Sequence, residues 1–241
     1  MNNEYVLGLY GKLPNYGDFV HRNLPAKFIN TWDSWLQQFV SGSQEQMGEQ
    51  WLDVYLTSPI WRFVLSAGIV DENHWAGIVL PSVDQVGRYY PFSIAIPLPA
   101  TVNPFEFISA NSYWFEKIEN LALRALDGQL TLDELIAMTE HQKSMLPMGY
   151  RKTGHQLQQN SSQQIDFQYA EELPSNVYAH LLDSLLTSNM GAYSVWSTSG
   201  SENVAPCLVN TKGLPSSSQI PAMMDGNWAH WGWPQPYIAN E

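Results

Sequence analysis

Two kinds of hydrophobic pattern alternate along the chain, and together they predict a protein built from both strands and helices. Continuous apolar runs bounded by proline, such as 75–80 before Pro81 and 92–96 after Pro91, are typical of strands buried on both faces. Apolar residues that recur every three to four positions predict amphipathic helices. We expect strands at 4–10, 58–65, 75–80, 92–96, 165–169, 192–198 and 206–209, and helices at 25–40, 43–56, 103–126, 131–139, 175–186 and 216–224.

The segment 25–40 has the clearest helical pattern. Phe28, Trp32, Trp35 and Phe39 fall on one face of this helix. Two tryptophans three residues apart could form a ligand cage, but aliphatic residues continue the same stripe. We therefore expect both tryptophans in the core, where truncation of either should cost about 3–5 kcal/mol.

Polar and aromatic segments interrupt this pattern later in the chain. Thr131 and Glu134 have the spacing of a capping box, which predicts a helix start. The Gln-rich stretch 141–164 predicts an exposed polar loop. The tail 227–234 contains three tryptophans, and we expect it to pack on the body because an exposed apolar patch of that size usually marks an interface.

The order of these elements predicts a single α/β domain over residues 1–241. We find no internal repeat and no interdomain linker, and the motifs described below concentrate in the N-terminal half, 1–100. Short connections between 61 and 96 favour antiparallel neighbours. We expect a central mixed, partly antiparallel sheet with helices on both faces.

The composition of the chain argues against two classes of binding partner, nucleic acids and anionic membranes. The chain has a net charge of -12 and only 11 Lys and Arg among 241 residues, whereas phosphate binding needs a basic face. We therefore expect neither nucleic acid nor an anionic membrane surface as a partner. No apolar run approaches the ~20 residues of a membrane span, and the N-terminus lacks the features of a signal peptide. A single cysteine, Cys207, fits a reducing compartment, so a cytoplasmic location is expected.

Nucleotide and metal chemistry are not expected either. The glycine-containing loop 11–19 follows a predicted strand, but it has neither phosphate-loop nor dinucleotide-binding spacing. The six His residues show no metal-ligand spacing. The sequence thus predicts no cofactor and no metal.

The sequence suggests a catalytic centre only through individual residues, because it contains no complete catalytic motif. Ser82 or Ser194 could form a triad with His74 and Asp84, but the Gly-x-Ser-x-Gly elbow is absent. Cys207 lies in an apolar strand without a neighbouring base, so an inert buried thiol is the better interpretation.

Five charged residues are the candidates for a functional or structural site. They are Lys12, Asp18, Arg62, Asp84 and Arg88, which lie among apolar and aromatic residues. Asp18 and Asp84 could act as paired carboxylates, or all five could be protein-binding residues. We favour an internal ion-pair network, in which Arg62 pairs with a carboxylate such as Asp18 or Asp84, because buried charges are rarely left single. Breaking such a buried pair should cost roughly 3–5 kcal/mol.

Four motifs follow one another in the first hundred residues. They are Gly11-Lys12-Leu13-Pro14 with Gly17-Asp18-Phe19, Trp32-Asp33-x-Trp35-Leu36, Pro59-x-Trp61-Arg62-Phe63, and Pro81-Ser82-Val83-Asp84-x-Val86-Gly87-Arg88-Tyr89-Tyr90-Pro91. This succession resembles the TagF (also called ImpM) family, accessory proteins of the type VI secretion system of Gram-negative bacteria. The C-terminal half matches more loosely, through 194–200, 213–215 and 224–226.

The resemblance carries expectations about fold and function. It implies a three-layer α/β/α arrangement and a cytoplasmic, post-translational negative regulator of a secretion system linked to virulence. In the family this repression acts by protein contact, usually with the forkhead-associated scaffold protein Fha, so we expect no catalysis. The resemblance assigns no contact residues, and the oligomeric state stays open. Two alternatives are a hydrolase that uses the Ser82/Asp84 loop and a structural adaptor at the secretion baseplate or membrane complex.

Overall fold

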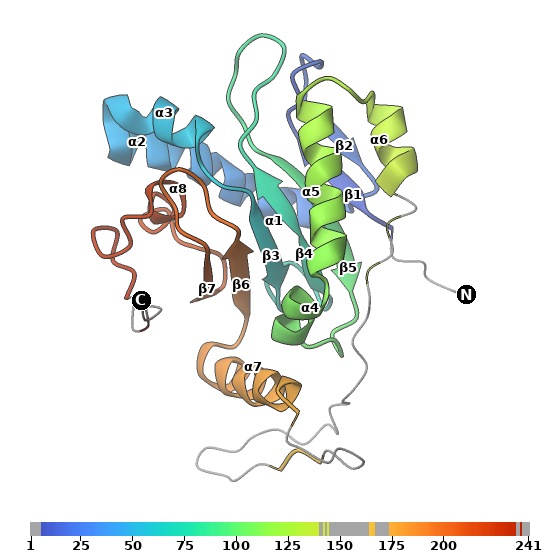
Figure 1. Cartoon of the computed structure of the whole chain (residues 1–241), viewed down its shortest axis with the longest axis vertical. Coiled ribbons are helices and arrows are strands. Elements are labelled where there is room, and N and C mark those ends of the chain that lie inside the picture. The colour runs from blue at the N-terminus through green and yellow to red at the C-terminus, as the bar shows by residue number, and fades with distance from the viewer. Residues whose placement is uncertain are drawn as a thin grey trace.

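The strands of this protein form one seven-stranded sheet. The computed structural model describes residues 6–139, 142, 144, 164–166, 174–234 and 237. The strand order is β2-β1-β5-β4-β3-β6-β7 (Figure 1). The strands are β1 (Gly8–Gly11), β2 (Val20–Arg22), β3 (Trp61–Leu65), β4 (His74–Leu80), β5 (Phe92–Leu98), β6 (Tyr193–Thr198) and β7 (Cys207–Lys212). Every pairing between these strands is antiparallel. The α/β class is confirmed, but the sheet is antiparallel where a mixed one was expected. The links from β3 to β4, β4 to β5 and β6 to β7 are too short for a parallel crossover.

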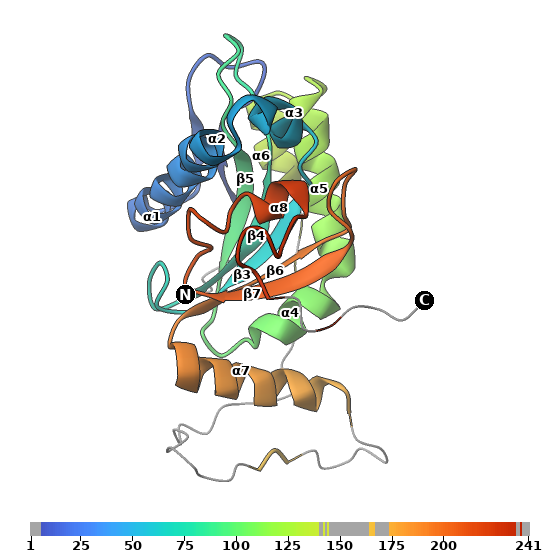
Figure 2. The same ribbon diagram turned by 90° about the vertical axis from the view of Figure 1, so that its left-hand side faces the viewer.

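Helices cover both faces of the sheet, so the expected three layers are confirmed. Figures 1 and 2 show α4, α5 and α6 over one face and α1, α2, α3 and α8 over the other. The helical elements are α1 (Ala26–Gln37), a π-helical turn η1 (Gln38–Gly42), α2 (Ser43–Met47), a 3-10 turn η2 (Gly48–Gln50), α3 (Trp51–Leu56), α4 (Pro104–Ala110), α5 (Ser112–Leu126), α6 (Leu132–Thr139), α7 (Asn176–Met190) and α8 (Ala222–Asp225).

The alternation of side chains along the strands produces two separate cores. Ile78 and Ile94 belong to a largely aliphatic core beneath α5, whereas the adjacent Val79 and Ala95 belong to an aromatic core beneath α1. The aromatic core contains Trp32, which is 0% exposed and donates its indole N–H to Ser93 Oγ at 2.9 Å. Trp35 is also buried there, so the prediction that both tryptophans are core residues is confirmed.

Two long predicted helices are each broken in the structure. The segment 43–56 divides at Gly48, whose φ of 59° ends α2. The segment 103–126 divides at Asn111, whose side-chain amide donates to the Phe107 carbonyl and competes with the helical backbone. The predicted helix 216–224 narrows to α8, because turns occupy 217–221 and regular helix begins only after Pro221.

The other boundary predictions have mixed outcomes. The capping box is confirmed, because the Thr131 amide donates to Glu134 Oε2 at 2.9 Å and the Glu134 amide donates to Thr131 Oγ1 at 3.3 Å. Residues 165 and 166 are not in a strand, while the remainder of the predicted strand 165–169 and nearly all of the predicted polar loop 141–164 lie outside the described residues.

The aromatic tail packs on the body as predicted. Trp233 is 7% exposed and donates its indole N–H to the Gln219 carbonyl at 2.9 Å. Trp228 meets Trp61 edge to face with a centroid distance of 6.3 Å. The tail therefore extends the aromatic core.

Candidate functional site

The loop 81–91, here called the signature loop, extends the hairpin of β4 and β5 beyond the sheet. The Tyr90 amide donates to the Ser82 carbonyl at 3.0 Å, and the Asp84 amide donates to the Arg88 carbonyl at 3.0 Å. The tip closes where the Gly87 amide donates to the Asp84 carbonyl, and Gly87 has a φ of 87°, which favours glycine. The signature loop is thus an ordered ribbon that holds its side chains in fixed directions.

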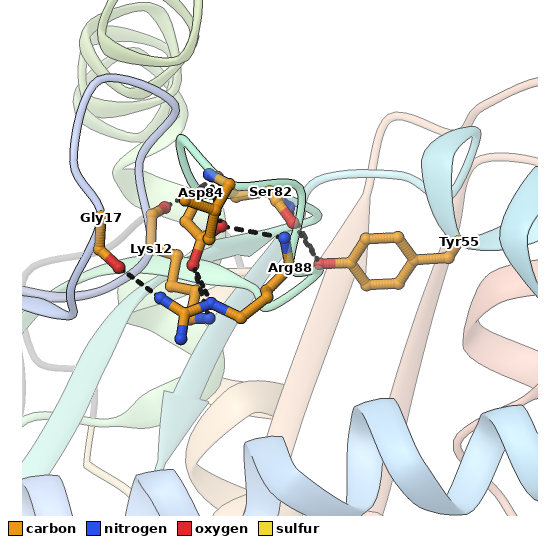
Figure 3. A network of polar contacts seen from close by, with 7 residues as sticks. Lys12, Gly17, Tyr55, Ser82, Asp84 and Arg88 are labelled. Atoms are coloured by element: carbon orange, nitrogen blue, oxygen red, sulfur yellow. Dashed lines mark hydrogen bonds and ion pairs between the residues drawn. The ribbon is translucent and has the colours of Figure 1, made fainter.

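Asp84 is the centre of a buried polar network within this ribbon (Figure 3). Its Oδ2 atom accepts from Lys12 Nζ at 2.8 Å and from Arg88 Nε at 2.6 Å. Its Oδ1 atom accepts from the amides of Val86 at 3.0 Å and Arg88 at 2.9 Å. Burial alone would raise the pKa of the Asp84 carboxyl, but the donors from Lys12, Arg88 and Val86 outweigh it and hold the pKa well below its usual range. The carboxylate is therefore charged and fully satisfied.

The same network joins the signature loop to the loop that follows β1. Ser82 Oγ donates to the Lys12 carbonyl at 2.7 Å, the Gln85 amide donates to the Tyr16 carbonyl at 3.1 Å, and Arg88 Nη2 donates to the Gly17 carbonyl. A Cβ at Gly11 would lie 2.1 Å from the Pro91 carbonyl oxygen, so only glycine permits this approach. Figure 3 shows the two loops side by side around Asp84.

Helix α3 supports this junction from the aromatic side of the sheet. The Tyr55 hydroxyl donates to the Ser82 carbonyl at 2.9 Å and accepts from the Ser82 amide at 3.0 Å. Burial raises the pKa of Tyr55 above its ordinary value, so the phenol stays neutral. We call the network of Lys12, Gly17, Tyr55, Ser82, Asp84 and Arg88 the clasp.

The structure brings together three of the five predicted charged residues. Lys12, Asp84 and Arg88 share the clasp, whereas Asp18 is exposed and joins no ion pair within the described ranges. Arg62 pairs with a carboxylate, as predicted, but neither of the two suggested partners, Asp18 and Asp84, is the one it meets. Arg62 instead donates to both carboxylate oxygens of Glu119 on α5, at 2.6 and 2.9 Å.

The position of Arg62 within the sheet explains this correction. Arg62 is opposite Ile78 in the β3–β4 ladder, so its side chain shares the face covered by α5. The clasp, by contrast, lies beyond the end of β4. The sequence offered only a weak indication that Glu119 could be the partner of Arg62. Glu119 follows Ile118, so its carboxylate lies beside the buried stripe of its helix.

A second polar contact, which the sequence did not single out, fixes the signature loop to α1. The hydroxyls of Tyr10 and Tyr90 both donate to Asp33 Oδ1 at 2.5 Å. Burial, followed by the Asp33 carboxylate, raises the pKa of both phenols. Phe19 covers this contact by stacking on Tyr10 at 5.8 Å and meeting Tyr90 edge to face at 4.8 Å. Asp33 belongs to the Trp32-Asp33 motif, which was the only signal available in the sequence.

The residues of the candidate triad are not assembled. The Ser82 hydroxyl donates to a backbone carbonyl, and His74 lies at the opposite end of β4, a strand of 7 residues that spans about 20 Å. The Ser194 hydroxyl donates to the Gly213 carbonyl at 2.6 Å. Burial raises the pKa of the Cys207 thiol to about 11, which makes it a weak nucleophile at neutral pH.

Across the described part of the chain, no three His, Cys, Asp or Glu side chains are grouped as metal ligands. No helix among those residues is both long enough and apolar enough to cross a bilayer.

Three side chains in or beside the clasp are exposed to solvent. Phe19 is 45% exposed, Val86 is 68% exposed, and the Arg88 side chain is 56% exposed. We call these three residues the rim. The clasp therefore offers a firm apolar and cationic surface above a buried ion-pair network.

Fold and clasp together define a class of three-layer α/β proteins in which an antiparallel sheet extends into a signature loop held by a buried ion-pair network. The family model of the TagF N-terminal domain, described as type VI secretion system-associated, matches residues 8–141, a range that contains every clasp residue. The chain belongs to this family, as the motifs predicted.

A solved structure supports the same assignment over almost the whole chain. The crystal structure of PA0076 from Pseudomonas aeruginosa PAO1 is 31% identical and has a TM-score of 0.76. The match covers 98% of this chain and 99% of that one. No curated protein matches the sequence.

Proposed function

We propose that this type VI secretion system-associated protein is a cytoplasmic, post-translational negative regulator that acts by protein contact and not by catalysis. The proposed partner is a forkhead-associated scaffold protein of the Fha type. Membership of the TagF family supports the connection with type VI secretion, and the regulatory role extends that membership.

The observation that supports the proposal most directly is that the polar groups of the signature loop already form hydrogen bonds within the clasp. The Ser82 hydroxyl and both Asp84 oxygens are already engaged by protein donors and acceptors. A catalytic group needs a reactive atom within hydrogen-bond reach of a substrate. A loop whose polar atoms are satisfied internally is better suited to present the rim to a partner.

Charge indicates what kind of surface this partner should offer. The net charge of the chain is -12, so a basic patch on the partner, outside its contact with the rim, would increase the rate of encounter, whereas Arg88 at the rim favours an acidic group in the contact itself. Phe19 and Val86 would supply apolar contact area at the rim, where Arg88 is the exposed cation. We therefore expect association to be faster at low ionic strength.

Capture of the scaffold protein from a secreting strain tests the proposal. Tagged protein should capture the Fha-type scaffold, and its overexpression should reduce type VI secretion. The double variant Phe19→Ser/Val86→Ser should weaken binding of the purified scaffold by about tenfold or more, because it removes apolar contacts at the proposed interface.

A matched control is Tyr113→Ser on α5, which alters another exposed aromatic residue outside the rim. If the scaffold binds both variants equally well, the rim is not the contact surface. If the scaffold does not bind the wild type and secretion is unchanged, the regulatory proposal is wrong.

A further inference from the structure

The two edges of the sheet differ in how well they are protected from pairing with a strand of another chain. The β2 edge has 3 residues, of which His21 and Arg22 are exposed. The β7 edge has 6 residues, and Lys212 at its end is its single charge. Natural sheets protect their edges with short strands, charges or proline. β7 lies at the margin of the sheet beyond β6 and has little of this protection (Figure 1).

The hydrogen-bond pattern identifies which backbone groups of β7 face outward. The Gly213 amide donates to the Ala192 carbonyl, and the Ser66 amide donates to the Tyr193 carbonyl. Backbone groups alternate in direction along an antiparallel strand, so the alternate residues Leu208, Asn210 and Lys212 direct their N–H and C=O groups away from β6. The described residues provide no backbone hydrogen-bond partner for these outward groups.

The side chains of the same three residues form an exposed row. Exposure alternates along β7, with Leu208, Asn210 and Lys212 all exposed, and Leu208 is 55% exposed. Val209 and Cys207 point to the other face and pack against the aromatic core. One strand edge thus combines free backbone groups with an exposed leucine.

We propose that this edge pairs with β7 of a second copy of the chain, in an antiparallel arrangement whose two-fold axis passes beside Asn210. In this register Leu208 lies opposite Lys212 of the second copy, and Asn210 lies opposite its own equivalent. All three outward-facing residues of each copy then find a partner, and no like charges face each other directly. A register centred on Lys212 would oppose two ammonium groups. The two sheets join into one continuous antiparallel sheet.

The self-complementary pattern of the edge favours a second copy as the occupant. An extended strand is what free alternating N–H and C=O groups recognise, and this edge is complementary to itself. Each copy carries a net charge of -12, which opposes association and should make the dimer stronger at higher salt.

Analytical ultracentrifugation of the full chain from micromolar to hundreds of micromolar tests the proposal. Asn210→Pro removes an outward N–H while leaving the β6 ladder intact, and Leu208→Lys places a charge on the edge. Both variants should weaken dimerisation by about tenfold or more, whereas Asn210→Ala, which keeps the backbone donor, should weaken it by less than about threefold. Thermal unfolding should confirm that Leu208→Lys, at an exposed position, remains folded.

Several results would overturn the inference. A wild-type protein that stays monomeric throughout this range contradicts it. A dimer that survives both Asn210→Pro and Leu208→Lys must use another surface. Binding of a foreign strand at this edge, shown by protection of the Leu208 and Asn210 amides only in the presence of the purified scaffold protein, would assign the edge to that partner instead.

Discussion

The clasp and the Arg62–Glu119 pair both join distant segments of this molecule through ion pairs, and they do so differently. In the clasp, Asp84 has a fully buried side chain and accepts from Lys12, Arg88 and two backbone amides. In the second site, Arg62 and Glu119 form one two-pronged pair whose side chains are 13% and 18% exposed. The clasp is a hub on which the positions of two loops depend, whereas the pair links one strand to one helix.

This difference determines what each site can tolerate. Removing the Asp84 carboxylate leaves Lys12 buried without its counter-charge and releases two backbone amides. Removing Arg62 leaves Glu119 with partial access to water, which can hydrate its carboxylate. Changes at the clasp should therefore cost more than changes at the Arg62–Glu119 pair.

The largest effect is expected for Asp84→Lys. The variant places a third cation beside Lys12 and Arg88, and the midpoint of thermal unfolding should fall by about 10 °C or more. Asp18→Lys is the matched control, because Asp18 is an exposed carboxylate in the adjoining loop, and its midpoint should change by less than about 2 °C. An unchanged midpoint for Asp84→Lys would refute the clasp as a structural hub and favour an interface role for Asp84.

Acid pH should remove the contribution of the Asp84 charge. The folded-state pKa of Asp84 is depressed, while its unfolded pKa is near 4, so this stability is present above about pH 4. It is lost as the pH falls below 4 toward the folded-state pKa. The difference in unfolding free energy between wild type and Asp84→Asn should be constant from about pH 5 to 8 and shrink below about pH 4. Denaturant titrations from pH 8 down to pH 2 measure it, and a difference as large at pH 2 as at pH 5 would contradict the assignment.

A smaller loss is expected at the Arg62–Glu119 pair. Arg62→Met keeps aliphatic packing over the Phe115 ring but removes two charge-assisted hydrogen bonds, so unfolding free energy should fall by about 2 kcal/mol. Lys117→Met, on the exposed side of the same helix, should change it by no more than about 0.5 kcal/mol. Urea denaturation compares the two, and a loss at Arg62 as large as that at Asp84 would erase the contrast between the sites.

Local patterns in the sequence predicted the parts of the fold that depend on neighbouring residues. Proline-bounded apolar runs located β4 and β5, and the helical stripe through Trp32 and Trp35 located α1. These predictions succeeded because strand and helix periods are short and continuous within one segment. The breaks at Gly48 and Asn111 escaped prediction, since the apolar stripe continues across both positions.

Contacts between distant segments were likewise predicted only in part from the sequence. The charged motifs indicated that Lys12, Asp84 and Arg88 belong together, because Asp84 and Arg88 lie four positions apart in one loop and Lys12 was a charged residue in another motif. The partner of Arg62 could not be inferred, since it depends on which sheet face α5 covers. The Asp33 contact was missed for the same reason, because Tyr10, Asp33 and Tyr90 come from three separate elements.

The sequence by itself determined the α/β class, the family and most of the secondary structure, because these depend on periodicity and on the order of motifs along the chain. Only the tertiary structure decided that the sheet is antiparallel throughout, beyond the strands between 61 and 96, that Arg62 turns toward Glu119, and that β7 is left as an open edge. Strand order and side-chain partners arise from packing between segments far apart in the chain, and no local pattern specifies which face or edge each segment will meet.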